Sequence, residues 1–238
     1  MFAVLLIAAF LAAAVSGAAG FGGALLLLPL LTGTVGPVLA IPLLTVAQLT
    51  GNFSRILFGF RDIHWRPAAL FLAPAIPCAV AGSLCFVSLP GAYAMRGIGL
   101  MLIVFAFLRW RGWLRFPRSN WLLGIGGVLV GFLSGLLGSA GPLGAAVFHA
   151  LELPPVAYIA TEATTALTLH AVKLAVYRRF ISLDPHFWRL ALALSAAMVA
   201  GTWTSRRLVH RLPTQQFRAF VTTLLAIIGL YMLLTGTH

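Results

Sequence analysis

The sequence predicts an all-α polytopic integral membrane protein with about eight transmembrane segments in two repeated halves. Three observations lead to this prediction: the composition, the long stretches without charge, and an internal repeat. Of the 238 residues, 61% are hydrophobic and only 8% are charged, whereas charged residues make up about 25% of a typical soluble domain. A protein with so few charges cannot expose most of its surface to water, so a soluble globular fold is excluded.

Charged residues are absent from four long stretches of the chain, which are 1–54, 67–95, 119–151 and 190–205. An α-helix needs about 20 apolar residues to cross the hydrocarbon core of a bilayer, which is about 30 Å thick. Three of the stretches exceed that length, and the last reaches it with its flanking residues. Dividing the chain at charges, Pro and Gly gives eight apolar segments, which are 2–32, 37–60, 67–88, 92–109, 120–150, 154–177, 187–205 and 217–235.

Two of these segments, 2–32 and 120–150, are about 30 residues long, which is too long for one ordinary crossing and too short for two. Glycines interrupt both segments near the middle. We therefore expect the first segment of each half to be kinked or broken at its glycines. Non-helical backbone at that depth is tolerated only inside protein or along a water-filled cavity.

An internal repeat relates the two halves at a fixed offset of 118 residues. The stretch 16–23 aligns with 134–141, with Ser and three Gly identical. The alignment continues without a gap through further identical pairs, among them Pro37/Pro155, Thr50/Thr168, Arg61/Arg179 and Ile63/Ile181. The predicted organisation is a four-helix repeat at 1–108, a basic linker at 109–119 that we expect to be cytoplasmic, and a second four-helix repeat at 120–238. The positive charges of the loops do not decide between parallel and inverted repeats.

The net charge of +12 comes mainly from arginines that lie between apolar segments. This distribution is typical of the positive-inside rule and of attraction to anionic lipid head groups, so we expect the lipid bilayer as a partner and no nucleic acid. We expect a multi-pass protein of the cell inner (plasma) membrane. A homodimer remains open.

The glycine-rich breaks have two interpretations. A helix that restarts at Gly22 and Gly23, or at Gly141 with Pro142 in its first turn, would point free N–H groups and a positive dipole end into the bundle. Small residues also allow helices to pack closely, without any ligand. Both alternatives stay open from the sequence.

Polar side chains follow one face of the second segment, where Gln48, Asn52 and Arg55 are spaced four and three residues apart. At the repeat offset, His170 aligns with Asn52 and Lys173 with Arg55. Cations within a membrane segment usually face a cavity or a partner, although long side chains near a segment end can also reach outward to the head groups. The recurrence in both halves favours a cavity.

Glu162 is the only acid deep in an apolar segment. We expect it either to pair with a cation such as Arg55 or Lys173, or to be protonated. It is therefore the candidate for proton coupling, with a structural ion pair as the alternative. No cluster of His, Cys, Asp and Glu predicts a metal site, and no cofactor or catalytic residue is expected.

The glycine-rich element from Gly17 to Pro29 and its counterpart from Gly135 to Pro142 resemble those of the TauE/SafE family of sulfite and organosulfonate exporters. The resemblance covers essentially the whole chain, and it implies duplicated four-helix halves and transport of sulfite, a sulfonate or a related carboxylate. The chain differs from the family pattern at 139–141, where it has Ser-Ala-Gly in place of a glycine triplet.

The sequence thus predicts a secondary transporter of small anions, with the binding site between the halves and alternating access. The candidate substrate-binding residues are Gly22, Gly23, Gln48, Asn52, Arg55, Ser139, Gly141, Thr165, His170 and Lys173. Two alternatives remain: an intramembrane hydrolase that uses Ser16 or Ser134 with a histidine, and a non-transporting membrane subunit.

Overall fold

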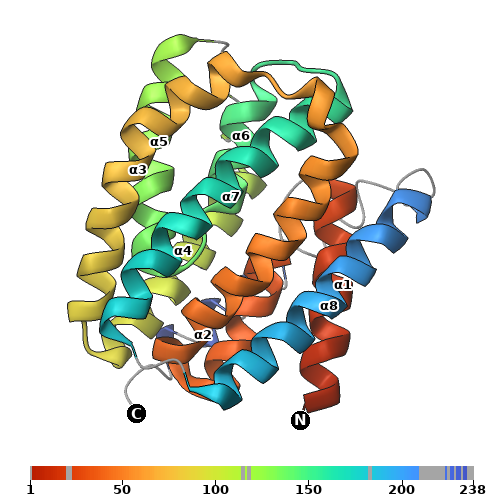
Figure 1. The fold of residues 1–238 in the computed structure, drawn as a ribbon. Helices are drawn as coiled ribbons and strands as arrows, with labels where there is room; N and C mark the ends of the chain where they lie inside the picture. The colour runs from red at the N-terminus through yellow and green to blue at the C-terminus, as the bar shows by residue number, and fades with distance from the viewer. Residues whose placement is uncertain are drawn as a thin grey trace.

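The computed structural model describes residues 2–19, 23–113, 116, 119–181, 184–208, 223, 226–227, 229–231 and 233–234. The regular structure of these residues is helical throughout (Figure 1). The elements are α1 (Phe2–Ala19), α2 (Gly23–Gly59), the 3-10 helix η1 (Phe60–Asp62), α3 (Trp65–Ser88), α4 (Gly91–Trp110), α5 (Asn120–Leu137), α6 (Gly141–His149), α7 (Pro155–Phe180) and α8 (Pro185–Leu208). Most of the predicted segment 217–235 lies outside the described residues.

Four helical stretches in the described part of the chain are long and apolar enough to cross a membrane. They are Leu26–Asp62, Trp65–Ser88, Gly91–Leu108 and Asn120–Leu137. Large apolar side chains are exposed along them, for example those of Phe53, Leu57 and Leu100. An apolar exterior of this kind suits contact with lipid rather than water. The prediction of an all-α membrane protein is confirmed, and the number of eight spans stays a prediction.

The first difference from the predicted segments is in α2, which runs through the expected boundary between 2–32 and 37–60. Only Gly36 leaves helical geometry, with φ 75° and ψ 161°. The cause is Pro37, whose ring disfavours helical backbone at the preceding residue and which has no N–H to donate. Gly36 can adopt the positive φ without steric cost. The boundary is therefore a kink inside one helical run.

The second difference concerns 120–150, which forms a helical hairpin rather than one interrupted helix. Gly138 ends α5 in a left-handed conformation, with φ 82°, and α6 begins at Gly141 and runs back along α5 (Figure 1). Opposite directions also follow from the contacts, because Gly126 faces Val147 whereas Gly144 faces Val130. The hairpin explains why this segment is too long for one crossing and too short for two.

The helices of the bundle pack in three main pairs, α2 with α7, α3 with α5, and α1 with α8 (Figure 1). The pair α2/α7 lies at the centre and runs antiparallel, since Gly59 faces Val156 and Ala160 while Arg55 reaches Glu162. These central helices carry the polar residues singled out in the sequence, so the fold places them between the two flanking pairs.

The pair α3/α5 is a parallel seam of small residues. Glycines four residues apart on α5 lie directly against carbonyl groups four residues apart on α3; the facing pairs are Gly127 with Phe71, Gly131 with Ala75, and Gly135 with Ala79. A Cβ atom at any of these glycines would collide with the carbonyl oxygen. Gly201 lies in the same way against the Phe10 carbonyl, in the pair α1/α8. The packing interpretation is therefore correct for Gly135.

Candidate functional site

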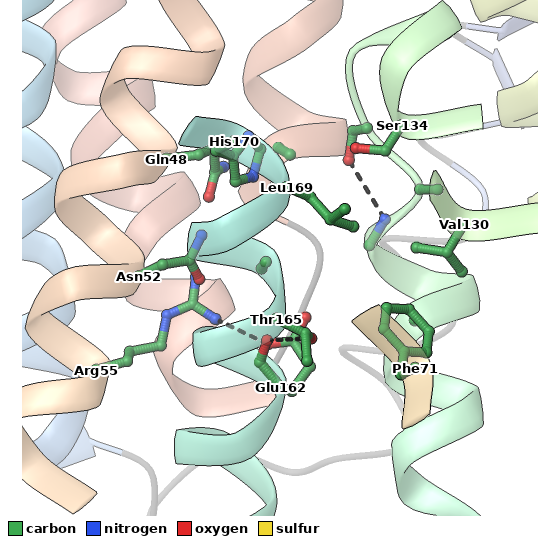
Figure 2. A pocket seen from close by; sticks show the side chains of 16 residues that line it. Gln48, Asn52, Arg55, Phe71, Val130, Ser134, Glu162, Thr165, Leu169 and His170 are labelled. Carbon is green, nitrogen blue, oxygen red and sulfur yellow. Dashed lines mark hydrogen bonds and ion pairs between the residues drawn. The ribbon is translucent and has the colours of Figure 1, made fainter. Parts of the chain in front are cut away.

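A cavity of about 50 Å³ lies between α2, α3, α7 and the α5–α6 hairpin. A buried water needs at least about 10–15 Å³ of such volume, so the cavity has room for a ligand of a few atoms. Figure 2 shows it from close by. Its lining consists of Ala24, Gln48, Asn52, Arg55, Phe71, Val130, Ser134, Ser139, Ala140, Gly141, Gly144, Glu162, Thr165, Ala166, Leu169 and His170.

The lining has a polar and an apolar side. Gln48, Asn52 and Arg55 enter from one face of α2, as their helical spacing predicts, and all three are buried. Across the cavity, the lining includes the side chains of Phe71 from α3 and Val130 from α5 (Figure 2). The polar side can recognise charge, and the apolar side limits size.

Arg55 and Glu162 form an ion pair in the cavity wall (Figure 2). Arg55 Nη1 lies 3.7 Å from Glu162 Oε2, and the two side chains are 7% and 9% exposed. This distance exceeds the 2.7–2.9 Å of a charge-assisted hydrogen bond, at about which such pairs are strongest. Of the pairings expected for Glu162, the structure has the one with Arg55. The interpretation that Arg55 extends outward to the lipid head groups is wrong, because its side chain is buried within the protein.

Four buried polar atoms of the lining have no hydrogen-bond partner among the described residues: Gln48 Nε2, Asn52 Oδ1, Glu162 Oε2 and His170 Nδ1. Leaving such an atom unpaired costs about 1–3 kcal/mol. Buried polar groups in folded proteins are nearly always satisfied, by protein, water or ligand. Their convergence on one cavity is therefore typical of a binding site.

The N-terminus of α6 also faces the cavity. Its cap residue, Ala140, has no side chain that can accept a hydrogen bond, and Pro142 has no N–H. The N–H of Gly141 donates only a long bond, 3.4 Å, to Ser139 Oγ. The positive end of the α6 dipole thus lies at the cavity that Arg55 also lines, and both features favour an anion.

Lys173 does not line the cavity. Its ammonium, which is fully buried, donates to Ser134 Oγ at 2.8 Å, to the Ser134 carbonyl at 3.3 Å and to the Gly138 carbonyl at 3.0 Å. One turn later, the Tyr177 hydroxyl donates to the Gly135 carbonyl at 2.6 Å. Lys173 and Tyr177 thus satisfy carbonyls that the end of α5 would otherwise leave unpaired. A cation at this end of α5 is also stabilised by the negative end of the helix dipole.

A family model described as "Sulfite exporter TauE/SafE" matches residues 5–232. The chain belongs to the TauE/SafE family. No curated protein and no solved structure gives a significant match to the chain. Membership of TauE/SafE indicates a multi-pass membrane protein that exports sulfite or organosulfonates, and a family of transporters agrees with the expectation of a non-enzyme.

The cavity of this TauE/SafE protein gathers most of the candidate residues. Those that line it are Gln48, Asn52, Arg55, Ser139, Gly141, Thr165 and His170, together with Glu162. The Thr165 hydroxyl donates to the Glu162 carbonyl within its own helix, at 2.8 Å. Gly23 begins α2 and is buried beside the lining residue Ala24, whereas Gly22 lies outside the described residues.

Sequence reasoning missed several lining residues. Ser134 carried a signal, because it opens the second glycine-rich element and aligns with Ser16. Phe71, Val130 and Leu169 carried none. An apolar residue that lines a cavity and one that contacts lipid look alike in a sequence that is 61% hydrophobic.

Proposed function

We propose that this protein is a secondary transporter of the inner membrane that binds a small oxyanion, sulfite or an organosulfonate, in the cavity between α2, α7 and the α5–α6 hairpin. The observation that carries the proposal is that one cavity joins Arg55, the α6 N-terminus and several buried polar atoms that have no hydrogen-bond partner among the described residues. In lipid such groups are expensive, and they typically mark a substrate pathway.

The chemistry of the lining suits an oxyanion. The planar guanidinium of Arg55 can donate two parallel hydrogen bonds to two oxygens of one anion. The Gln48 amide nitrogen has no hydrogen-bond partner within the described part of the chain, and the Gly141 N–H donates only a long bond. A volume of about 50 Å³ favours sulfite and the smallest sulfonates over longer organic anions.

Helix boundaries support two repeats, because they recur at the offset of 118 residues. The last described residue of α1, Ala19, corresponds to the end of α5 at Leu137, and the first described residue of α2, Gly23, corresponds to the start of α6 at Gly141. The end of η1 at Asp62 corresponds to the end of α7 at Phe180. The packing corresponds as well, since α1 packs against α8 while its counterpart α5 packs against α3.

Inverted rather than parallel repeats are the topology we propose, because the corresponding helices α2 and α7 run antiparallel. The halves are 1–108 and 120–238, joined by the basic linker 109–119 on the cytoplasmic side, with about eight apolar segments in all. Inversion requires an odd number of crossings in each half, so the broken first segment of each half crosses twice. In the second half this segment is the α5–α6 hairpin, and we propose a matching hairpin of α1 and α2 in the first half, where the turn lies outside the described residues. Movement of the α3/α5 pair, which joins the two halves, relative to α2 and α7 would expose the cavity alternately to the two sides.

The test is sulfite flux into vesicles reconstituted with purified protein. The variant Arg55→Ala removes the cation of the cavity, and we expect flux to fall at least about tenfold, because charge-assisted hydrogen bonds contribute about 1.5–3 kcal/mol. The matched control is Arg61→Ala, an exposed arginine of η1, for which flux should persist. Full flux in a folded Arg55→Ala protein would remove Arg55 from the site.

A hydrolase deserves a separate test because the distance of 2.8 Å between Ser134 Oγ and Lys173 Nζ matches a Ser–Lys catalytic pair. Against this function, the lysine has three oxygen acceptors, which match the three donors of an ammonium ion. An ammonium engaged in this way has no lone pair with which to take the serine proton. Labelling by a serine-directed covalent probe, lost in Ser134→Ala, would favour the hydrolase.

A further inference from the structure

The charges of the cavity lining balance. Glu162 is its only acid, and Arg55 is its only arginine or lysine among the described residues. Arg55 and Glu162 are paired with each other, so the lining carries no net charge when His170 is neutral. With Glu162 still ionised, an anion beside Arg55 would set two negative charges against one guanidinium, which costs several kcal/mol unless something offsets it. The Lys173 ammonium lies outside the lining and is already engaged by oxygens of Ser134 and Gly138.

We propose that the anion replaces Glu162 as the partner of Arg55, and that Glu162 takes up a proton as it does so. The transporter then carries one proton with each monovalent anion. This inference rests on the proposed function and adds to it the identity of the coupling ion.

The charge balance of the step is simple. Before binding, Arg55 is positive and the Glu162 carboxylate is negative. One proton from water bonds to a carboxylate oxygen of Glu162, and one monovalent anion takes the place of that oxygen beside the guanidinium. After binding, Glu162 is a neutral carboxylic acid, the positive Arg55 faces the negative anion, and the cavity is again neutral.

The geometry of the pair suits such an exchange. At 3.7 Å, the guanidinium and the carboxylate are held by charge without a short hydrogen bond between Nη1 and Oε2. Oε2 has no hydrogen-bond partner among the described residues, so this oxygen is available to a proton. The carboxyl group lies at the cavity, where a neutral acid can donate its new hydrogen to the bound anion.

The groups around Glu162 single it out as the proton site. On α2, Arg55 faces Glu162. Helix α5 has no titratable side chain. The titratable side chains of α3, which are Arg66, Cys78 and Cys85, do not line the cavity. The charged residues of η1, Arg61 and Asp62, are exposed. The only titratable side chain of α6, His149, contacts the Tyr158 ring at the far end of α6. On α7 itself the titratable neighbours are Tyr158, His170 and Lys173.

His170 is the rival proton site, since it also lines the cavity and its Nδ1 is unpartnered among the described residues. A proton on His170 would add a positive charge near Arg55 and Lys173. A proton on Glu162 instead removes the negative charge that competes with the anion for Arg55. Only the second explains why an acid lies beside the cation of an anion site.

The experiment is calorimetric titration of the purified protein in detergent with methanesulfonate, the anion of a strong acid, which stays monovalent throughout the titration. Sulfite is titrated in parallel, with its own protonation subtracted. Repeating each titration in two buffers of different ionisation enthalpy gives the number of protons taken up per anion. The variants are Glu162→Gln, which imitates the protonated acid, His170→Gln for the rival site, and Glu152→Gln as the control at an exposed glutamate.

Wild type and Glu152→Gln should take up about one proton per anion, with affinity falling about tenfold per pH unit once Glu162 is ionised. Glu162→Gln should bind the anion without proton uptake and without that pH dependence. No uptake in the wild type, unchanged uptake in Glu162→Gln, loss of uptake in His170→Gln alone, or a folded Glu162→Gln that binds no anion would each overturn the proposal. Failure of the wild type to bind any of the anions would overturn the proposed function itself.

Discussion

Lys173 on α7 donates a 2.8 Å hydrogen bond to Ser134 on α5, and the same ammonium reaches the carbonyls of Ser134 and Gly138. A helix that ends inside a membrane leaves carbonyls that no water can satisfy. Lys173 supplies their donors, and Tyr177 supplies one more at Gly135. The hairpin that presents the α6 N-terminus to the cavity therefore depends on a residue outside the cavity.

Replacing this lysine should destabilise the protein. The variant Lys173→Met keeps an apolar side chain of similar length but removes the donors, and we expect a loss of about 3 kcal/mol, or roughly 6–12 °C in Tm. Thermal unfolding in detergent measures it. The control is Arg178→Met, an exposed cation of the same helix, which should unfold near the wild-type temperature. An unchanged Tm for Lys173→Met would show that the ammonium does not cap α5.

Amine chemistry offers a second test, because Lys173 is the only lysine of the chain. Its full burial predicts that an amine-reactive reagent leaves it unmodified in the native protein and modifies it after denaturation. Mass spectrometry of the peptide that contains residue 173 reads out both states. Rapid modification of the native protein would contradict the buried position.

The seam between α3 and α5 predicts that a single added methyl group on a seam glycine strongly lowers the stability of the protein. Gly131→Ala would place a Cβ against the Ala75 carbonyl, whereas Gly124→Ala, on the same helix, meets no atom within 4 Å. We expect Gly131→Ala to lose about 1–3 kcal/mol through overpacking and Gly124→Ala to be neutral or slightly stabilising. Tm in detergent compares the two. Equal stability of the variants would argue against direct backbone contact between α3 and α5.

Gly138 should be needed for the site as well as for the fold. Alanine at its φ of 82° costs about 1–2 kcal/mol and would crowd Ile41, at 3.0 Å. Gly112→Ala imposes a similar φ, 71°, at a position with nothing within 4 Å. Both variants should be less stable, but only Gly138→Ala should weaken anion binding, because it shifts the start of α6. Equal anion affinity in the two variants would show that the turn at Gly138 does not position the binding site.

The ion pair should matter more for transport than for stability. Arg55→Met leaves a buried carboxylate without its cation, which costs about 3–5 kcal/mol, whereas replacing both members by apolar residues is often neutral or stabilising. We therefore expect the double variant Arg55→Met/Glu162→Met to unfold at a higher temperature than Arg55→Met alone. Sulfite flux should be lost in both variants. Recovery of flux in the double variant would show that neither charge is needed.

Sequence reasoning succeeded where charge or spacing left a signal. The stripe of Gln48, Asn52 and Arg55 is recognisable because polar residues three and four apart share a helix face. Glu162 is recognisable as the single acid in an apolar segment. The position of Lys173 outside the cavity was not recognisable, because the repeat aligns Lys173 with Arg55 although, of the two, only Arg55 lines the cavity.

The path of the chain was predicted less well than its helices. The glycine-rich break was foreseen, but only the contacts of Gly126 and Gly144 show that α6 turns back along α5. Likewise, Gly36 and Pro37 suggested a boundary, where the helix in fact continues past a kink. Glycine permits a turn, a kink or close packing, and the neighbours that select among them come from distant parts of the chain.

Phe71 contributes both to the seam between α3 and α5 and to the cavity. Its carbonyl oxygen lies against Gly127, and its side chain is part of the cavity lining. At the glycines of α5 the backbones of α3 and α5 touch directly, without an adjustable side chain between them, so the two helices should resist sliding past each other. The apolar wall that limits the size of the solute thus belongs to the α3/α5 pair, whereas the charged side chains of Arg55 and Glu162 lie opposite, on α2 and α7. A substitution at Phe71 or Val130 can retune the accepted size while the ion chemistry stays intact.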